Sequence, residues 1–435
     1  MGARETALNV LIACRKEGGW SNGVLKTYTA RDRLDRREAA LASRLCYGVL
    51  QNRLKLDFYL QQLLTGKVKD LHPAVRDILH LGLYQLKLMD KIPDAAAVNE
   101  SVALTKKYCP KVRSAPGLVN AVLRRASAET FAEPKSYVEK YSHPQVLVDL
   151  LKDYVGKDRL ENMLRANNEI VPMTVQVNTL KTTAEDLQKA LEGEGITAQN
   201  HGWLENCLVL TGTGNLESLQ SFREGHFYVQ DPAAKLSVLC AGIPENSRVL
   251  DCCAAPGGKT FAAYIVMNGT GSVTSCDIHE HKIPLIEKGA QRLGFANITA
   301  CCQDGAVFNA LWENAFDAVI ADVPCSGYGI IRKKPDIRYK DPATMKELPQ
   351  LQLQILRNQA RYVKPGGVLL YSTCTLVRGE NEGVVEQFLA ENDDFALEPL
   401  CIPDVFPKRQ TGMLVLVPGE YDTDGFFMAR LRKKL

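Results

Sequence analysis

Residues 249–260 read Val-Leu-Asp-Cys-Cys-Ala-Ala-Pro-Gly-Gly-Lys-Thr, so that a short apolar run ends and a glycine pair opens a helical stretch. An open α/β sheet binds its ligand where a strand ends and a helix begins, and glycines permit close backbone approach. The Gly-Lys-Thr end resembles a phosphate loop, but that motif requires glycine where Cys253 stands. The Gly-x-Gly-x-x-Gly dinucleotide spacing is absent as well. We therefore expect a nucleoside-type ligand at this loop.

Short apolar runs separated by helix-length stretches follow this loop and indicate an α/β fold. Strands that alternate with helices pair in parallel, so we expect a doubly wound sheet with helices on both faces. The last two runs lie close together, which is typical of an antiparallel hairpin at the sheet edge. The runs span residues 248–252, 272–276, 298–302, 318–321 and 368–372, with 413–417 and 425–431 as the hairpin.

The residues before this sheet divide into two further regions. Between residues 5 and 126 apolar side chains recur at helical spacing, which indicates an all-α region. Val175, Val177 and the run 207–210 are typical of strands beside a helical segment at 183–191, which indicates a small α+β region. We therefore expect three domains, at residues 1–140, 141–225 and 226–435.

The formal net charge of +3 conceals an asymmetry between the two ends of the chain. Residues 1–140 contain 24 Lys and Arg and 14 Asp and Glu, which gives a net charge of +10. The rest of the chain contains 29 Lys and Arg and 36 Asp and Glu, which gives a net charge of −7. A basic module joined to an acidic body suggests a polyanion partner, with nucleic acid as the first candidate. The alternative is an ordinary solvated helical face.

Composition excludes several classes of protein. Thirteen cysteines without an N-terminal apolar leader favour free thiols in a reducing cytoplasm. No apolar run approaches the roughly 18 residues that a membrane-spanning helix needs, so we expect no membrane partner. No Cys-x-x-Cys spacing occurs, and we expect no metal site.

Aspartates follow the second and third predicted strands. Asp277 stands 26 residues after Asp251, where a carboxylate can bridge two ribose hydroxyls. Asp304 has the matching place for the edge of a base. Each also has a structural interpretation, Asp277 as a helix cap and Asp304 as a turn residue before Gly305.

Cysteines follow the fourth and fifth predicted strands, as Cys325 and Cys374, and both are expected to face one crevice. Strand cysteines such as Cys276, Cys301 and Cys302 are instead expected to be buried and inert. Methylation of carbon 5 of cytosine is one reaction that uses two thiols, because a thiolate added at carbon 6 activates carbon 5. A base or second thiol then assists removal of the proton and release of the product.

Two polar groups complete this expected site. Asp322 is placed to bond N3 and the exocyclic amine of the ring, which favours the addition of the thiolate. The charge of Lys259 and the helix N-terminus after Gly258 would stabilise a thiolate or carboxylate that faces the crevice.

These motifs together resemble the bacterial 16S ribosomal RNA cytosine-5 methyltransferases of the RsmB type, also called Sun or Fmu, over nearly the whole chain. The resemblance implies a class I, Rossmann-like methyltransferase domain that uses S-adenosylmethionine, with Cys374 as nucleophile and Cys325 assisting product release. Lys259 and Asp322 are then expected to be catalytic residues as well. The cofactor-binding residues that it implies are Cys253, Ala254, Ala255, Pro256, Gly257, Gly258, Lys259, Asp277, Asp304 and Asp322.

The same resemblance makes residues 1–140 a NusB-like RNA-binding domain, recognised by the stretch 91–100, and makes the α+β region a further part of the RNA groove. The motif Asp336-Ile337-Arg338-Tyr339 also belongs to the family pattern. We expect a monomer that methylates free or partly assembled small-subunit RNA. The alternatives are a methyltransferase for another RNA and a non-catalytic RNA-binding factor with a degenerate methyltransferase body.

Overall fold

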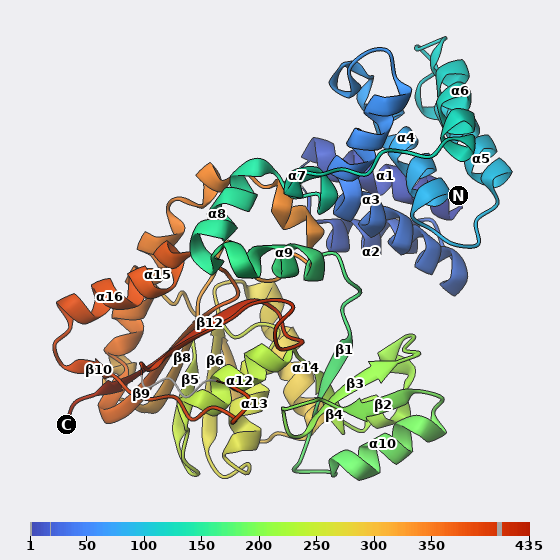
Figure 1. The fold of residues 1–435 in the computed structure, drawn as a ribbon. Helices are drawn as coiled ribbons and strands as arrows, with labels where there is room; N and C mark the ends of the chain where they lie inside the picture. Colours follow the sequence, from blue (N-terminus) through green and yellow to red (C-terminus); the bar gives the residue numbers. More distant parts are fainter. Residues whose placement is uncertain (1, 18, 407–410) are drawn as a thin grey trace. The chain divides into compact units, whose positions relative to one another are not determined.

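A computed structural model describes residues 2–17, 19–406 and 411–435. The chain forms two units (Figure 1). The first comprises Met1–Asp153, Lys157–Asn168 and Ile331–Lys340, and the second comprises Tyr154–Gly156, Glu169–Ile330 and Asp341–Leu435. Among the described residues, no helix is long and apolar enough to cross a membrane.

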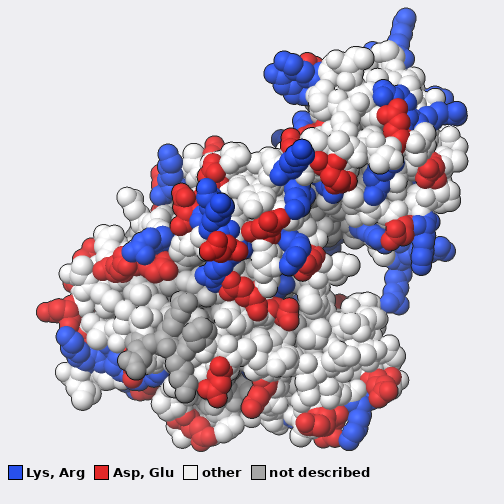
Figure 2. Space-filling view, in the orientation of Figure 1, with Lys and Arg blue, Asp and Glu red and all other residues white. Residues whose placement is uncertain are grey.

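The first unit is helical around one apolar core that includes Leu8, Leu45, Ile78 and Leu123. Helix starts follow simple chemistry, since the Asp35 side chain accepts from Glu38 N and Pro73 occupies a first-turn position. Lys and Arg side chains project from several sides of this unit in Figure 2. Its helices are α1 (Ala3–Glu17), α2 (Ser21–Arg31), α3 (Arg36–Leu63), α4 (Pro73–Lys87), α5 (Asp94–Tyr108), α6 (Ala115–Ala128), α7 (Tyr137–Lys140) and α9 (Lys157–Ala166), with most of α8 (Gln145–Val155).

A segment from late in the sequence, Ile331–Lys340, is part of this helical unit. Arg338 lies in η5 (Pro335–Tyr339), is only 1% exposed, and donates to the carbonyl oxygens of Gln51, Ser142 and Asn167 at 2.9–3.3 Å. Asp336 accepts from Ser21 Oγ at 2.5 Å. Because a buried guanidinium requires acceptors for its N–H groups, these bonds fix the segment to the helices.

The second unit begins with a four-stranded antiparallel sheet in the order β2-β3-β1-β4. Helix α10 (Ala184–Gly193) covers it through Leu187 and Leu191, which pack with Val175 and Leu208. The strands are β1 (Met173–Val177), β2 (Thr197–Asn200), β3 (Cys207–Thr211) and β4 (Phe227–Val229), so this sheet extends past residue 225.

The rest of the second unit contains an eight-stranded sheet in the order β10-β12-β9-β8-β5-β6-β7, with β11 paired to β12. Strands β5 to β9 are parallel, and β12 runs antiparallel beside β9. The strands are β5 (Arg248–Asp251), β6 (Ser272–Asp277), β7 (Ile298–Cys302), β8 (Phe316–Asp322), β9 (Val363–Thr373), β10 (Phe395–Leu397), β11 (Met413–Leu416) and β12 (Phe426–Lys433).

Helices cover both faces of this sheet, as Figure 1 shows. One face packs against α12 (Pro232–Ala241), α13 (Gly258–Val266) and α14 (Ile283–Leu293), and the other against α15 (Leu348–Ala360) and α16 (Glu382–Glu391). The expected α/β fold, with an all-α region and a small α+β region before it, is therefore confirmed. The carboxyl ends of the five parallel strands meet at one edge, where a doubly wound sheet places its ligand site.

Candidate active site

The loop that joins β5 to α13 is shaped by glycine and by backbone bonds to both neighbouring strands. Gly257 has φ +113°, a conformation that side chains rarely allow, and an added Cβ would lie 2.5 Å from the Phe261 ring. Cys252 N donates to Ile320 O on β8, and Ala254 N donates to Cys276 O on β6. The loop is thus held among the carboxyl ends of three strands, β5, β6 and β8.

Beneath this loop lies a buried chain of hydrogen bonds. Thr260 Oγ1 donates to Asp251 Oδ2 at 2.7 Å and lies 2.8 Å from Ser275 Oγ. Asp251 is fully buried, and burial raises the pKa of this carboxyl to about 7 despite the Thr260 bond. This chain ties β5, β6 and α13 together under the loop.

The two strand-end aspartates have different surroundings. Asp277 ends β6, accepts from His279 N at 3.0 Å and lies 3.5 Å from Lys282 Nζ. Asp304 accepts from Ala306 N at 2.9 Å, as a turn aspartate does. Asp304 therefore fits its structural interpretation as a turn residue. Asp277 does not fit its interpretation as a helix cap, because the helical turn at residues 280–282 follows His279 and α14 follows Lys282.

Asp322 ends β8 and is held on both of its oxygens. Lys259 Nζ lies 2.7 Å from Asp322 Oδ2, and Ser372 Oγ donates to Oδ1 at 2.8 Å. The Lys259 side chain is 10% exposed and that of Asp322 is 29% exposed, so the pair is largely shielded but reachable. Lys259 Nζ also lies over the Phe426 ring, 5.0 Å from its centroid. Ser372 and Phe426 are site residues that the sequence analysis did not identify.

The two thiols after β8 and β9 face each other. Cys325 Sγ and Cys374 Sγ are 3.2 Å apart, and both residues are half-buried. The hydrogen bond with Cys374 raises the pKa of the Cys325 thiol well above its ordinary value, and burial and the Glu380 carboxylate act in the same direction. Such a pair can supply one thiolate and one thiol to a single reacting ring.

The remaining cysteines near the sheet only partly follow expectation. Cys276 is buried, and its Sγ lies 3.3 Å from Cys301 Sγ on the next strand. That hydrogen bond lowers the pKa of Cys301 to about 7. Cys302 is exposed and Cys301 is half-buried, so the expectation that both are buried is wrong, because β7 is the edge strand of the sheet. Among the described residues, no group of three or more His, Cys, Asp or Glu could hold a metal ion.

Two polar residues that the sequence analysis missed lie behind both thiols. Glu380, in η7 (Arg378–Glu380), and the adjoining Asn381 bond to residues that flank Cys325 and Cys374. The sequence could have indicated both residues, because polar residues that follow a strand end and precede a helix lie at the ligand edge of such a sheet.

Family profiles match three successive parts of the chain. Residues 240–432 match the 16S rRNA methyltransferase RsmB/F family, residues 1–128 match the NusB family, and residues 143–217 match the ferredoxin-like domain of RsmF/B-like methyltransferases. The matches follow the order of the helical region, the small sheet and the large sheet.

Relatives of similar length are found in several bacteria. The chain is 35% identical to the probable ribosomal RNA small subunit methyltransferase B of Bacillus subtilis, over 99% of this chain and 98% of that protein. It is 34% identical to ribosomal RNA small subunit methyltransferase B of Vibrio cholerae, over 93% and 92% of the two chains.

Solved structures share the fold. The crystal structure of PH0851 covers 100% of this chain and 99% of its own, with a TM-score of 0.81 at 23% identity. A methyltransferase homologue from Pyrococcus horikoshii is 27% identical and has a TM-score of 0.59, covering 68% of this chain and 97% of its own.

Proposed function

Because this chain belongs to the RsmB/F family of ribosomal RNA methyltransferases, we propose that it transfers a methyl group from S-adenosylmethionine to carbon 5 of a cytosine in 16S ribosomal RNA. The observation that carries this proposal is the pair of thiols, Cys325 and Cys374, 3.2 Å apart at the carboxyl ends of β8 and β9. Carbon 5 of cytosine is a poor nucleophile, and a thiolate added at carbon 6 removes that obstacle.

We assign the addition to Cys374. Its Sγ forms a bond to carbon 6, and the electron pair of the 5,6 double bond becomes available at carbon 5. Asp322, at the edge of the ring, would bond N3 and the exocyclic amine and so stabilise the protonated ring. Lys259 orients the Asp322 carboxylate through its 2.7 Å contact.

Product release requires two further events. The proton on carbon 5 leaves to a water molecule, the electron pair of the carbon–hydrogen bond forms the 5,6 double bond again, and Cys374 departs as a thiolate. Cys325 lies 3.2 Å from the departing sulfur and can donate its proton there, which stabilises the leaving thiolate. Its raised pKa suits this role, because the thiol keeps its proton until it is needed.

The residues at the β5 loop fit a nucleoside-type cofactor. The buried Asp251 Oδ1 has no hydrogen-bond partner among the described residues. We propose that residues 253–259 with Asp277, Asp304 and Asp322 hold S-adenosylmethionine. When bound, this cofactor supplies a methyl group on a positively charged sulfur.

The RNA would be held outside this site by the preceding domains, which we place at residues 1–140 and 141–225. The second boundary is better placed after Val229, because Phe227 pairs with Val177 in the small sheet. The basic charge of residues 1–140 suits a phosphate backbone. An accessible strand is required, since the cytosine must leave its stack to reach the thiols.

The test uses full-length protein, 16S RNA and S-adenosylmethionine labelled in the methyl group, resolved on a denaturing gel. Cys325→Ala should retain a labelled covalent RNA band, because methyl transfer proceeds and release stalls. Cys374→Ala should give no band and no methylated RNA. Cys401→Ala, which removes an exposed thiol elsewhere, is the matched control and should behave as the unaltered protein.

Three other results would contradict parts of this proposal. A band with Cys374→Ala alone exchanges the roles of the two thiols. Methylated RNA without any band, in either variant, contradicts the covalent route. No methylated RNA with the unaltered protein, together with retained RNA binding, favours the non-catalytic alternative.

A further inference from the structure

Glu380 is a buried carboxylate close to the thiols. The residue is 3% exposed, and its side chain is held by three neutral donors. Ser326 Oγ donates to Oε1 at 2.5 Å, while Ser326 N and Gln352 Nε2 donate to Oε2, each at 2.9 Å. Burial of a charged group is costly unless its oxygens are fully bonded, so this carboxylate has a specific place in the fold.

The same network connects the two loops that carry the thiols. Ser326 follows Cys325 directly, and its Oγ lies 2.6 Å from the Oγ1 of Thr375, which follows Cys374. Gln352 Nε2 also donates to Pro324 O, on the other side of Cys325. Glu380 therefore bonds one side of Cys325 directly, is connected to the other side through Gln352, and reaches the loop of Cys374 through Ser326.

Asn381 adds matching bonds on the side of Cys374. Thr373 Oγ1 donates to its Oδ1 at 2.6 Å, and its Nδ2 donates to Thr375 O at 3.1 Å. Glu380 and Asn381, together with Gln352, thus hold the residues on both sides of both thiols. Two loops from different strands are set against each other by one short segment.

The carboxylate acts on the two sulfurs unequally. Glu380 bonds directly to the loop of Cys325, whereas only the neutral Asn381 bonds directly to the residues that flank Cys374. A negative charge disfavours ionisation of the nearer acid. In a pair that shares one hydrogen bond, this bias decides which sulfur releases its proton first.

We propose that Glu380 is a positioning residue that sets the two thiol loops together and keeps Cys325 as the protonated member of the pair. The inference rests on the proposed function, because it assigns the order in which the two thiols act. Glu380, which lies outside the pair of thiols, would be the cause of that order.

The test titrates the thiols without RNA or cofactor. In full-length protein carrying Cys374→Ala, the rate of Cys325 alkylation by iodoacetamide is followed against pH by peptide mass. Cys325 should titrate above the ordinary thiol range, and Glu380→Gln should lower its pKa by about one unit. At a pH below the pKa of Cys325 in both proteins, alkylation should be roughly tenfold faster with Glu380→Gln than without it.

The matched control is Glu382→Gln, which neutralises a carboxylate two residues away that accepts from Tyr154 OH. It should leave the titration of Cys325 unchanged. Ser326→Ala, which breaks the bridge to Thr375 but retains the Glu380 charge, should leave the pKa of Cys325 raised. Circular dichroism of each variant separates a change in titration from a loss of fold.

In protein with both thiols, limiting iodoacetamide should modify Cys374 before Cys325, and Glu380→Gln should reduce that preference. The same pKa of Cys325 in the Glu380→Gln protein and in the protein with Glu380 would overturn the proposal. If Glu380→Gln does not fold, titration of Cys325 at the ordinary thiol value in the Cys374→Ala protein would overturn it. Failure of the proposed methyl transfer would instead appear as RNA without methylcytosine while these thiol titrations stand.

Discussion

Lys259 Nζ and Asp322 Oδ2 are 2.7 Å apart and join the first turn of α13 to the end of β8. The pair therefore spans the proposed cofactor loop and the strand that leads to Cys325. Because both side chains are largely shielded, loss of either one leaves the other charge without its partner in a poorly solvated place.

The first prediction concerns this pair. Lys259→Met and Asp322→Asn should each slow methyl transfer by about 10²- to 10⁴-fold, since Asp322→Asn removes the carboxylate that stabilises the protonated ring and Lys259→Met removes the contact that orients it. Single-turnover rates at saturating RNA and S-adenosylmethionine measure this effect. The double variant should lose no more than the worse single variant, because the two residues act as one unit.

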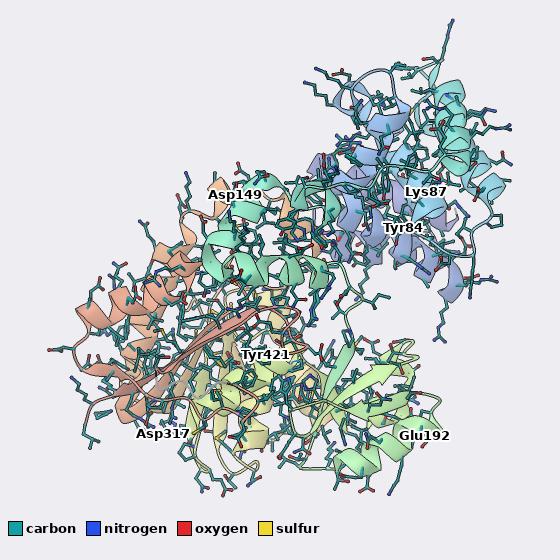
Figure 3. The ribbon with its side chains drawn as sticks, viewed as in Figure 1. Tyr84, Lys87, Asp149, Glu192, Asp317 and Tyr421 are labelled. Atoms are coloured by element: carbon teal, nitrogen blue, oxygen red, sulfur yellow. The ribbon has the colours of Figure 1, made fainter. Side chains whose placement is uncertain are left out.

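The control for this prediction is an ion pair at the opposite end of the same strand. Lys364 Nζ lies 2.6 Å from Asp317 Oδ1, and Asp317 is labelled in Figure 3. Asp317→Asn and Lys364→Met should change the methyl-transfer rate by less than about threefold, because exposed pairs contribute little. Equal losses from both pairs would show that the effect is general destabilisation.

A second prediction tests how closely the backbone is packed behind Cys374. Gly329 N donates to Cys374 O, and an added Cβ on Gly329 would lie 2.0 Å from Gly425 O. Gly329→Ala should therefore displace the loop, lower the free energy of unfolding by about 2 kcal/mol or more, and slow covalent adduct formation. Gly379→Ala, where the added Cβ meets nothing within 4 Å, should change the free energy of unfolding by less than about 0.5 kcal/mol.

Local sequence patterns predicted the order of elements well, because strand periodicity and strand-end chemistry are both local. The run at 298–302 coincides with β7. Residues 368–372 proved to be only the end of β9, which begins at Val363. Strand β9 continues through Pro365 and the adjoining Gly366, which has φ +75°, with a shift in its register against β8.

Other features depend on contacts between residues far apart in the sequence, and periodicity does not record them. The motif around Arg338 was visible, but its burial among Gln51, Ser142 and Asn167 was not. Likewise, strand-end position identified Cys325 and Cys374, whereas the role of Glu380 becomes apparent only when its bonds to Ser326 are known.

A third prediction concerns pH and Asp251. Its pKa is raised to about 7 in the folded protein, against 3.8 for an ordinary aspartate, so the folded state holds this proton more tightly than the unfolded state. The contribution to stability is therefore complete below about pH 4 and is lost as pH rises through 7. A shift of about three pKa units, at about 1.4 kcal/mol for each unit, makes this contribution about 4 kcal/mol.

Asp251→Asn should remove this dependence. Urea unfolding at several values between pH 4 and 8 should show the variant gaining stability relative to the unaltered protein as pH rises. Asp317→Asn is the contrasting control, because the pKa of Asp317 is lowered and its contribution is lost only under acidic conditions. A difference that does not vary with pH would contradict the proposed burial of a protonated Asp251.

The fourth prediction concerns RNA affinity and salt. Arg36 and Arg37 are exposed in the first turn of α3, where positive charge opposes the helix dipole. Their replacement by Gln should not weaken the helix, so any loss of RNA affinity reports lost phosphate contacts. If both side chains contact single-stranded RNA, the slope of log K against log salt should fall by about 1.4.

Arg357→Gln, which removes a charge paired with Glu391 on the catalytic domain, should leave that slope unchanged. A salt-independent affinity of the unaltered protein would contradict electrostatic binding of RNA by residues 1–140.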